Sequence, residues 1–423
     1  MKIAVIGAGI AGNVAARLLH PAHEVTVFEA AGHAGGHSHT HEVEVGDRRV
    51  AVDTGFIVYN ERTYPRFTDW LARLGVPTQE STMSFSLRDE ASGLEYNGTS
   101  LNALFVQRRN LLRPSFLGMV RDILRFHREA PRLLEQSGDE LPLGSFLAAG
   151  RYGRAFREHY IVPMGAAIWS TDAGRMLEFP ARFFVRFLHN HGMLTVNDRP
   201  VWRTIEGGSA RYVARLTAPF RHRIRLHTPV ERVRRLPAGV IVKPRGQEAQ
   251  VFDAVFLACH SDQALALLAD PSEPERQVLS AIPYQRNEAV LHTDRRLLPR
   301  RRLAWAAWNY HRPAEAQERV ALTYHMNLLQ RLDTPDPLLV TLNRSDAIDP
   351  ARILKRVVYQ HPVFTPASVT AQSRQREING ARRTYFCGAW WRNGFHEDGV
   401  VSAEDAVSHF EDDIAQRALH RTA

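Results

Sequence analysis

The sequence predicts an α/β protein with a doubly wound parallel sheet and a second, α+β domain. Two strand–glycine–helix units, at 2–29 and 384–418, predict the parallel sheet, because this pattern is typical of phosphate-binding turns. The regions 99–199 and 286–374 follow a different pattern, helical first and then rich in short strands, which predicts the second domain. At 423 residues, the chain also exceeds the usual size of one compact core.

The first unit has the full context of a dinucleotide-binding fingerprint. The strand-like run Lys2 to Ile6 leads into the glycine turn 7–12, GAGIAG, and then into a helical pattern that Pro21 stops. A second buried strand, Glu24 to Phe28, is followed by the acid Glu29, roughly 20 residues after the turn. Strand, turn, helix, strand and acid therefore follow one another in the order that the fingerprint requires.

Each glycine of this turn has its own expected role. Gly7 would make the tight turn, Gly9 would let a pyrophosphate approach the backbone, and Gly12 would let the helix pack on the strand. Glu29 would accept hydrogen bonds from the adenosine ribose. The other dinucleotide-binding residues expected here are Ile10, Ala11 and Ala30.

The residues beyond the fingerprint favour FAD over NAD. A glycine doublet follows the second strand, and near the other end of the chain a strand at Thr384 to Cys387 leads into a helix that opens with His396. A distant C-terminal segment that returns to the first domain is typical of flavoproteins. The FAD-binding residues expected in these segments are Gly35, Gly36, His37, Thr54, Gly55, Gly388, Asp398, Gly399, Val400 and Val401.

These motifs resemble those of the FAD-dependent amine oxidase and phytoene desaturase superfamily. The resemblance covers the full length and is concentrated at Gly7 to Glu29, Gly35-Gly36, Trp202 to Ile241 and Tyr385 to Ala406. It implies a discontinuous Rossmann-like FAD-binding domain with an α+β substrate domain, in the two-domain architecture of the amine oxidases. It also implies that the backbone at Val230 meets the adenine.

The implied domain boundaries follow from the same resemblance. The FAD-binding domain would comprise 1–98, 200–285 and 375–423, and the substrate domain would comprise 99–199 and 286–374. Strands of the substrate domain are expected near 287–293, 303–309, 320–327 and 337–343. The active site would lie between the two domains.

Two stretches resemble a bacterial subgroup of predicted NAD/FAD-binding proteins. These stretches are Pro163 to Ser170, PMGAAIWS, and Gly394 to Gly399, GFHEDG. Some relatives of that subgroup act on phospholipid acyl chains, as the desaturase of methylated furan fatty acid synthesis does. The resemblance therefore implies dehydrogenation of a lipid or fatty-acyl chain by hydride transfer to flavin N5, with His396 or Glu397 handling the proton.

Several positions depart from the amine-oxidase pattern. The family's lysine near flavin N5 would fall near 289–293, where this chain has none, and Lys355 lies in a run, ARILKRVVY, that suggests a helix. His37 replaces the usual arginine after the glycine doublet, and His396 aligns with the tyrosine that helps to cage the amine. These departures weaken the interpretation as an amine oxidase. An amine or amino-acid oxidase that produces hydrogen peroxide is therefore kept as the alternative enzyme, and a non-catalytic flavin-bearing membrane-associated protein is a second alternative.

Aromatic residues suggest the substrate pocket. Phe179 to Leu194 is rich in phenylalanine and poor in acids, which favours an apolar wall. The residues expected to line a deep apolar pocket are Tyr59, Trp169, Trp308, Tyr310 and Tyr324. The histidines at 33, 37, 39 and 41 alternate, but no Asp or Cys completes a known metal-site spacing, so no metal is expected.

The charge of the chain is the remaining clue to its partners. The formal net charge is +9, and all 54 basic residues except Lys2, Lys243 and Lys355 are arginine. Arginines and apolar residues alternate at helical spacing within 101–134, with Phe116 among the apolar ones, which suggests either a helix on an anionic membrane or a surface helix packed on the core. No nucleic-acid-binding motif accompanies the charge, so nucleic acid is not expected as a partner. The absence of a signal peptide and of a long apolar run predicts a cytoplasmic protein that can bind the inner face of the membrane.

Overall fold

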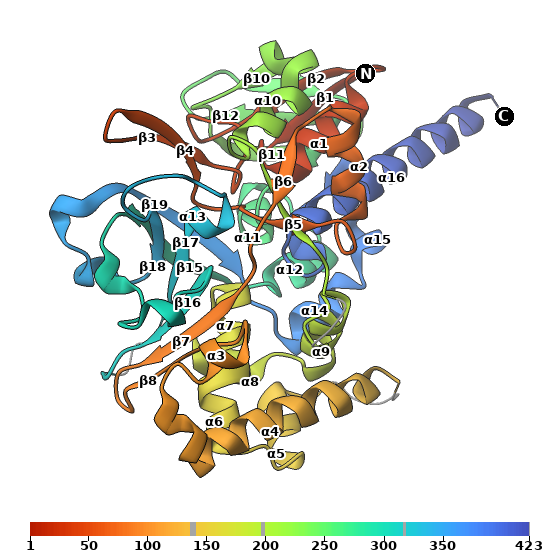
Figure 1. Ribbon diagram of the computed structural model, residues 1–423. Helices are drawn as coiled ribbons and strands as arrows, with labels where there is room; N and C mark the ends of the chain where they lie inside the picture. Colours follow the sequence, from red (N-terminus) through yellow and green to blue (C-terminus); the bar gives the residue numbers. More distant parts are fainter. Residues whose placement is uncertain (136–140, 196–198, 316–318, 423) are drawn as a thin grey trace.

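The computed structural model describes residues 1–135, 141–195, 199–315 and 319–422 (Figure 1). Its first sheet is parallel and has five strands in the order β10-β2-β1-β14-β20. These strands are β1 (Lys2–Ile6), β2 (Glu24–Phe28), β10 (Ile224–Arg225), β14 (Ala254–Leu257) and β20 (Thr384–Phe386). Segments from three distant parts of the chain therefore build one sheet, which confirms the predicted Rossmann-like domain.

Two helices at opposite ends of the chain pack together on this sheet. They are α1 (Ile10–Leu19), which follows the glycine turn, and α16 (His396–Thr422), which follows β20. Their buried side chains share one apolar core with β1, β2 and β14. A three-stranded sheet of β11 (Val230–Arg235), β12 (Val240–Pro244) and β13 (Gln250–Phe252) contributes to a second apolar core, which includes the side chains on the other side of β1.

The remaining helices of this domain surround the sheet. They are α2 (Pro65–Arg73), α10 (Ala210–Thr217), α11 (Ser261–Leu267), α12 (Glu273–Ser280), α14 (Pro366–Gln372) and α15 (Gln375–Ile378). Smaller strands connect the domains: the hairpin of β3 (Thr40–Val45) and β4 (Arg48–Asp53), and the sheet of β5 (Tyr59–Asn60), β9 (Trp202–Ile205) and β6 (Thr78–Glu80).

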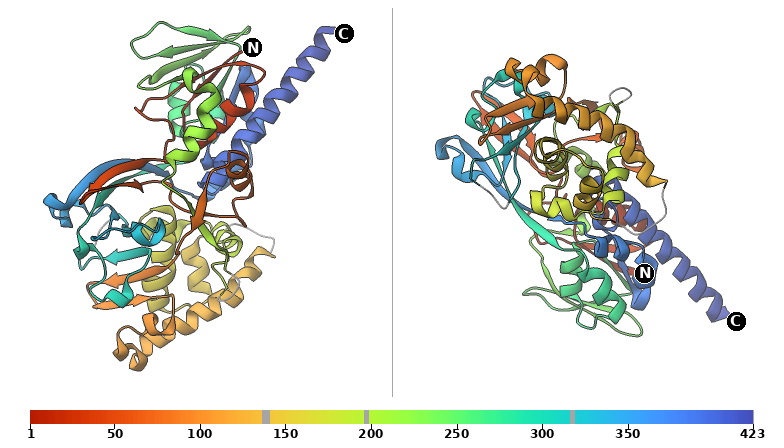
Figure 2. Two further views of the ribbon diagram at one scale, coloured as in Figure 1. Left: turned by 45° about the horizontal axis from the view of Figure 1, so that its top comes forward. Right: turned by 90° about the horizontal axis from the view of Figure 1, so that it is seen from below.

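The second domain is built on a seven-stranded mixed sheet in the order β19-β15-β18-β17-β16-β7-β8. Its strands are β7 (Phe85–Asp89), β8 (Leu94–Asn97), β15 (Tyr284–His292), β16 (Trp308–Arg312), β17 (Ala321–His325), β18 (Leu339–Leu342) and β19 (Ile353–Pro362). The short helix α13 (Met326–Leu329) follows β17. The views of Figure 2 show the helices of 101–190 gathered on one side of this sheet.

The helical part of the second domain confirms the helical pattern predicted for 101–134 and continues beyond it. Its helices are α3 (Leu101–Leu104), the 3₁₀ helix η1 (Arg108–Leu112), α4 (Pro114–Glu129), the 3₁₀ helix η2 (Ala130–Leu134), α5 (Leu143–Ala149), α6 (Arg154–Phe156), the π-helical turn η3 (Arg157–Ile161), α7 (Val162–Trp169), α8 (Ala173–Glu178) and α9 (Ala181–Asn190). They enclose an apolar core with buried Phe126, Phe156 and Phe184. In the described part of the chain, no helix is long and apolar enough to cross a membrane.

Three details differ from the predictions. β7 and β8 were expected in the FAD-binding domain, yet β7 pairs in parallel with β16 and so belongs to the second sheet. The run at 351–359 was expected to be helical, but most of it forms β19, because an antiparallel pairing with β15 that runs from Tyr284 to His292 overrides the local preference. The strand expected at 303–309 begins only at Trp308, since Arg302–Ala304 is a 3₁₀ turn.

Candidate active site

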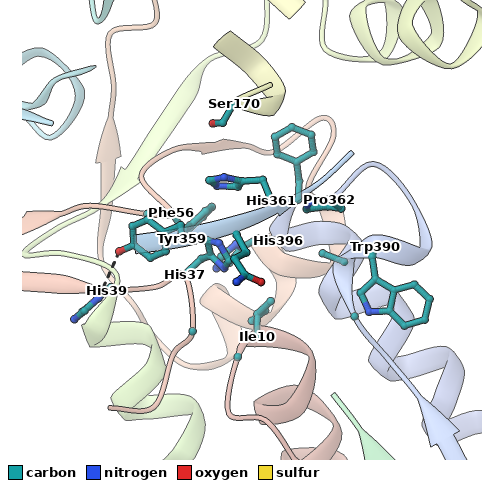
Figure 3. Close-up of a pocket in the computed structure, with 18 of the residues that line it drawn as sticks. Ile10, His37, His39, Phe56, Ser170, Tyr359, His361, Pro362, Trp390 and His396 are labelled. Carbon is teal, nitrogen blue, oxygen red and sulfur yellow. Dashed lines mark hydrogen bonds between the residues drawn. The ribbon is translucent and has the colours of Figure 1, made fainter. Parts of the chain in front are cut away.

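A cavity of about 1160 Å³ lies between the two domains, and both contribute to its wall (Figure 3). Most of the predicted site residues meet there although they come from distant segments. The predicted cofactor-binding residues in its wall are Gly7, Gly9, Ile10, Ala11, Glu29, Ala30, Gly35, Gly36, His37, Gly55, Val230 and Gly388. The predicted catalytic residue His396 and the predicted pocket residues Trp169, Trp308 and Tyr324 also line it.

The three glycines of the turn have distinct geometries that match their expected roles. Gly7 has φ of +104°, and a Cβ there would lie 2.6 Å from the carbonyl oxygen of Ala258. A Cβ on Gly12 would lie 1.9 Å from the carbonyl oxygen of Gly7, so α1 packs on β1 only because residue 12 has no side chain. A Cβ on Gly9 would have no described atom within 4 Å. The free space beside Gly9 therefore belongs to the cavity and fits the approach of a pyrophosphate.

The carboxylate of Glu29 is fixed at the edge of the same space. Its Oε2 accepts a hydrogen bond from the backbone N–H of Ala8 at 2.7 Å, and its Oε1 accepts one from Ala31 at 2.8 Å. Each carboxylate oxygen has a second lone pair, which ribose hydroxyl groups can use. The acid is thus pre-positioned for the adenosine end of a dinucleotide.

Six predicted cofactor-binding residues lie behind the wall rather than in it. Gly12 and Gly399 permit close packing: a Cβ on Gly399 would lie 2.6 Å from Cγ2 of Ile10, where α16 meets α1. Val400 is buried in the apolar core, and Thr54 hydrogen-bonds to the hydroxyl of Tyr359 at 2.7 Å. Asp398 accepts the backbone N–H of Phe395 at 2.9 Å, and Val401 does not line the cavity either.

His396 is buried at the start of α16, where other side chains hold it rigidly. Its Nε2 is hydrogen-bonded to Oγ of Ser38 at 2.8 Å and to the hydroxyl of Tyr212 at 3.0 Å. Its ring is stacked on Phe56, with 3.5 Å between the ring centroids. Burial and the neighbouring His37 lower the pKa of His396 well below its ordinary value, so the imidazole is neutral.

Glu397 has a different position from the one that its predicted role requires. Its Oε1 accepts the backbone N–H of Arg66 at 3.0 Å, and its Oε2 accepts that of Phe67 at 2.9 Å. Both N–H groups belong to the first turn of α2, which no side chain of its own caps. Glu397 therefore caps a helix outside the cavity wall, and the prediction that it handles the substrate proton is wrong.

Aromatic and aliphatic side chains form the half of the cavity next to the helices. The wall there includes Tyr160, Met164, Ile168, Trp169, Phe187, Met193, Trp308 and Tyr324. The predictions for Tyr59 and Tyr310 are wrong, because Tyr59 packs against Phe67 in the core of the first domain and Tyr310 lies in the core of the helical part. The indole Nε1 of Trp308 is buried and has no hydrogen-bond partner in the described part of the chain.

Charge is nearly absent from the cavity. Among the described residues of the wall, Glu29 at the dinucleotide end is the only acid, and the exposed Arg199 is the only arginine or lysine. An organic ammonium bound in the helical half would therefore find aromatic faces but no carboxylate. Removing the ammonium from water would therefore cost free energy that no carboxylate offsets. An uncharged, apolar ligand does not incur this cost.

Three neutral histidines from different segments contribute polar groups to the cavity wall. His37, His260 and His361 all line the cavity, with 5.3 Å between the rings of His37 and His361 and 6.4 Å between those of His37 and His260. Burial lowers the pKa of His37 and of His260 to about 4, and that of His361 to about 3. The buried Nε2 of His37 has no partner among the described residues, so a bound ligand would supply one.

The tautomer of His361 follows from its neighbour Asn287 on β15. The amide Nδ2 of Asn287 donates to the carbonyl oxygen of Ser170 at 3.0 Å, which settles the orientation of the amide. The same Nδ2 donates to Nδ1 of His361 at 2.9 Å. Nδ1 is thus the acceptor in the neutral ring, and Nε2 carries the proton. Sequence reasoning missed His361 because the preceding run 351–359 suggests a helix rather than a strand. The alternation of Val357, Tyr359 and His361 is the available signal.

Three of the alternating histidines near the glycine turn lie side by side: His33 is stacked on His39, and His41 is tilted against His39. The ring centroids of His33 and His39 are 3.8 Å apart, and those of His39 and His41 are 4.0 Å apart. In the described ranges, no group of three or more His, Cys, Asp or Glu residues is arranged to hold a metal ion. Burial lowers the pKa of His39 and of His41 to about 4, with Lys355 contributing in both cases.

Solved structures share this architecture over nearly the whole chain. Cyclohexylamine oxidase from Brevibacterium oxydans IH-35A is 16% identical with a TM-score of 0.72, and the match covers 97% of this chain and 99% of that one. Putrescine oxidase bound to putrescine is 14% identical with a TM-score of 0.69, covering 97% and 99%. A fatty acid isomerase from P. acnes that produces CLA is 18% identical with a TM-score of 0.67, covering 96% and 98%. At these identities the likeness concerns the fold.

The sequence comparison adds the family. No curated protein sequence matches significantly. The family described as flavin containing amine oxidoreductase matches residues 10–304, which is more than half of the chain. The open space at Gly9, the poised carboxylate of Glu29 and the unpartnered Nε2 of His37 fit the FAD that this family uses. The chain therefore belongs to the flavin-containing amine oxidoreductases and is an FAD-dependent oxidoreductase.

Proposed function

We propose that this enzyme dehydrogenates an acyl chain of a lipid, and that the lipid is a membrane phospholipid. The observation that carries the proposal is the helical half of the cavity, which is walled by aromatic and aliphatic side chains and, among its described residues, has no acid. When bound, FAD supplies the acceptor for the hydride that leaves the chain. An apolar wall binds such a chain by removing its surface from water.

The same wall argues against a cationic amine as the substrate. An alkylammonium group needs a carboxylate or several well-placed acceptors to offset its desolvation. The cavity's acid, Glu29, is already engaged by two backbone N–H groups at the dinucleotide end. No lysine lies in the described part of the wall, so the residue expected beside flavin N5 in the amine oxidases also has no counterpart there.

The side chains of the cavity divide the remaining work. Trp169, Trp308 and Tyr324 would hold the chain and exclude water, since Trp169 itself is fixed by Phe187 at 4.7 Å between ring centroids. At the reacting end, His361 of the cavity wall would act as a hydrogen-bond donor, which differs from the proton-handling role predicted for His396 or Glu397. With Nδ1 occupied by Asn287, its Nε2–H can donate a hydrogen bond to a polar group of the bound molecules but cannot take up a proton. The proton that the substrate releases, along with the hydride accepted by FAD, would therefore be the one that passes to solvent.

The test uses the purified protein with its FAD. Under anaerobic conditions, dispersed phospholipids with saturated, unsaturated and cyclopropane-modified chains are added one at a time, and loss of the visible flavin absorbance is followed. Mass spectrometry then looks for an acyl product lighter by two hydrogen atoms. Reduction by a lipid together with that product supports the proposal.

Other outcomes identify the alternatives. Reduction by polyamines, cyclic amines or amino acids, with hydrogen peroxide released in air, would overturn the lipid proposal in favour of an amine oxidase. Flavin that stays oxidised with every lipid and every amine would indicate a flavin-bearing protein without this activity. Comparison of the lipids of a deletion strain with those of the wild type identifies the acyl chain that the reaction changes.

A further inference from the structure

An outward face of the helical part combines leucines with arginines. We call it the Leu–Arg face, and it comprises Leu111, Leu112, Leu117, Leu124, Arg108, Arg109, Arg121 and Arg128. Its leucines are large exposed side chains: Leu112 is 87% exposed, Leu124 55%, Leu111 50% and Leu117 44%. On α4 the residues 117, 121, 124 and 128 follow the spacing of one helical face, so leucine and arginine alternate along it.

The leucines of this face are not needed for the core. The opposite side of α4 presents Phe116, Met119 and Phe126, which are buried in the apolar cluster of the second domain. Phe116, which the sequence suggested for a membrane contact, is therefore a core residue. Figures 1 and 2 place α4 along the outer edge of the molecule, away from the parallel sheet.

The net charge of the face is positive, although two of its four arginines each meet an acid: Arg121 lies 3.7 Å from Asp122 and Arg128 lies 3.1 Å from Glu129. Within 101–134 the acids are Asp122 and Glu129, against seven arginines. Asp122 is buried and accepts the backbone N–H of Gly153 at 2.8 Å. Arg108 donates to the carbonyl of Phe105 and to Asn102, and Arg109 donates to the carbonyl of Gly93, so neither is neutralised by an acid in the described part of the chain.

We propose that the Leu–Arg face docks on an anionic phospholipid bilayer. Leucines that alternate with arginines match the two layers of such a surface, because the leucines enter the acyl boundary while the guanidinium groups meet phosphates. A nucleic acid would use the arginines but would leave four exposed leucines unexplained. The proposal concerns where the enzyme binds and stands independently of the reaction.

The inner side of the same helix contacts a residue of the cavity wall. On α4, Nε2 of His127 is hydrogen-bonded to the hydroxyl of Tyr160 at 3.2 Å, and Tyr160 lines the cavity wall. The helix α4 and the helical turn Arg157–Ile161, which carries Tyr160, therefore lie between the proposed membrane contact and the apolar half of the site. Docking through this face would bring the bilayer next to the place where its acyl chains are proposed to react.

The experiment measures binding of the FAD-loaded protein to sedimenting vesicles of phosphatidylcholine alone and of phosphatidylcholine with phosphatidylglycerol. We expect at least tenfold tighter binding to the anionic vesicles, and weaker binding as salt is raised. The double variants Leu112→Asp/Leu124→Asp and Arg121→Gln/Arg128→Gln should each lose at least tenfold in affinity. The matched controls are Val251→Asp, at a site on β13 that is 66% exposed, and Arg48→Gln/Arg49→Gln on β4.

Retention of the flavin spectrum shows that each variant is folded. Equal binding to neutral and anionic vesicles would overturn the proposal, as would variants of the face that bind like the controls. Binding to single-stranded RNA that competes with vesicles and needs the arginines but not the leucines would replace the membrane with a nucleic acid. The vesicle assay measures binding and does not measure flavin reduction, so a failure of docking is distinguishable from a failure of the proposed dehydrogenation.

Discussion

Asn287 donates a hydrogen bond from Nδ2 to Nδ1 of His361 at 2.9 Å, across the paired strands β15 and β19. Because Asn287 also donates to the carbonyl oxygen of Ser170, its amide cannot turn over without losing a bond. The imidazole is therefore held as a neutral donor that presents Nε2–H to the cavity. Its low pKa, about 3, keeps it neutral across the physiological range.

The first prediction tests this donor. His361→Leu should lower the rate of flavin reduction by substrate about 100-fold, a loss typical of removing one well-placed donor. His361→Gln keeps an N–H group and should recover part of the rate. Nitrogen NMR of the labelled ring should show a protonated Nε2 in the wild type. A protonated Nδ1, or a leucine variant that reacts at the wild-type rate, would contradict the assignment.

The glycine turn allows a second prediction. Gly9→Ala adds a Cβ that meets no described atom within 4 Å, and Gly9 has an ordinary φ of −71°. The flavin-free protein should therefore unfold at the wild-type denaturant concentration. The dissociation constant of FAD should rise at least about tenfold, or roughly 1.4 kcal/mol, because the methyl group occupies the approach of the pyrophosphate.

Gly12→Ala is the matched contrast to that variant. Its Cβ would lie 1.9 Å from the carbonyl oxygen of Gly7, so it should destabilise the flavin-free protein itself. For both variants, urea unfolding measures the stability of the flavin-free protein, and titration with FAD followed by fluorescence measures the dissociation constant. If Gly9→Ala bound FAD as tightly as the wild type, the pyrophosphate would not lie beside residue 9.

A third prediction concerns the helix cap made by Glu397. Glu397→Ala should lower the free energy of unfolding by about 1–2 kcal/mol, because two N–H groups at the start of α2 lose their acceptor. The rate of flavin reduction should stay near the wild-type value. The exposed Glu411 provides the control, since Glu411→Ala removes an acid from the same helix without touching α2. Loss of turnover without loss of stability would restore a catalytic role for Glu397.

A fourth prediction is a pH dependence from Asp398. Burial raises the pKa of Asp398 to about 7 from an ordinary 3.8, so the native state holds a proton that the unfolded state has released between these pH values. The contribution of this group to stability is therefore complete below about pH 4 and is lost as the pH rises toward 7.

The substitution Asp398→Asn removes that titration. It keeps an oxygen that can accept the N–H of Phe395, so the variant should be more stable than the wild type at pH 7 to 8 and should lose less stability between pH 4 and 7. Urea unfolding across this range measures the difference, with the exposed Asp333→Asn as control. Parallel pH curves for the wild type and Asp398→Asn would show that Asp398 is ionised in the native state.

The local sequence was sufficient to predict the dinucleotide-binding half of the site. Gly7, Gly9, Gly12 and Glu29 lie within one strand–turn–helix–strand unit, where short-range sterics and hydrogen bonds set the conformation. The apolar wall was readable only in part: Trp169 and Phe187 line the cavity, whereas Phe179 and Phe184 of the same phenylalanine-rich stretch are buried in the core of the second domain. The Rossmann-like domain and the FAD thus followed from residue type and spacing, and the aromatic wall followed in part.

Pairing between strands that are distant in the sequence decided the remaining features of the fold and of the site. β7 joined the second sheet because it pairs with β16, more than 200 residues later, and β19 became a strand because β15 offers it a long antiparallel partner. The same pairing brings His361 to Asn287, whereas Glu397 and His396, adjacent in the chain, are directed to a helix cap and to the cavity wall. Adjacent residues on a helix start point in different directions, so which side chain meets the substrate depends on the elements packed around that turn, and the composition of any one segment does not contain that information.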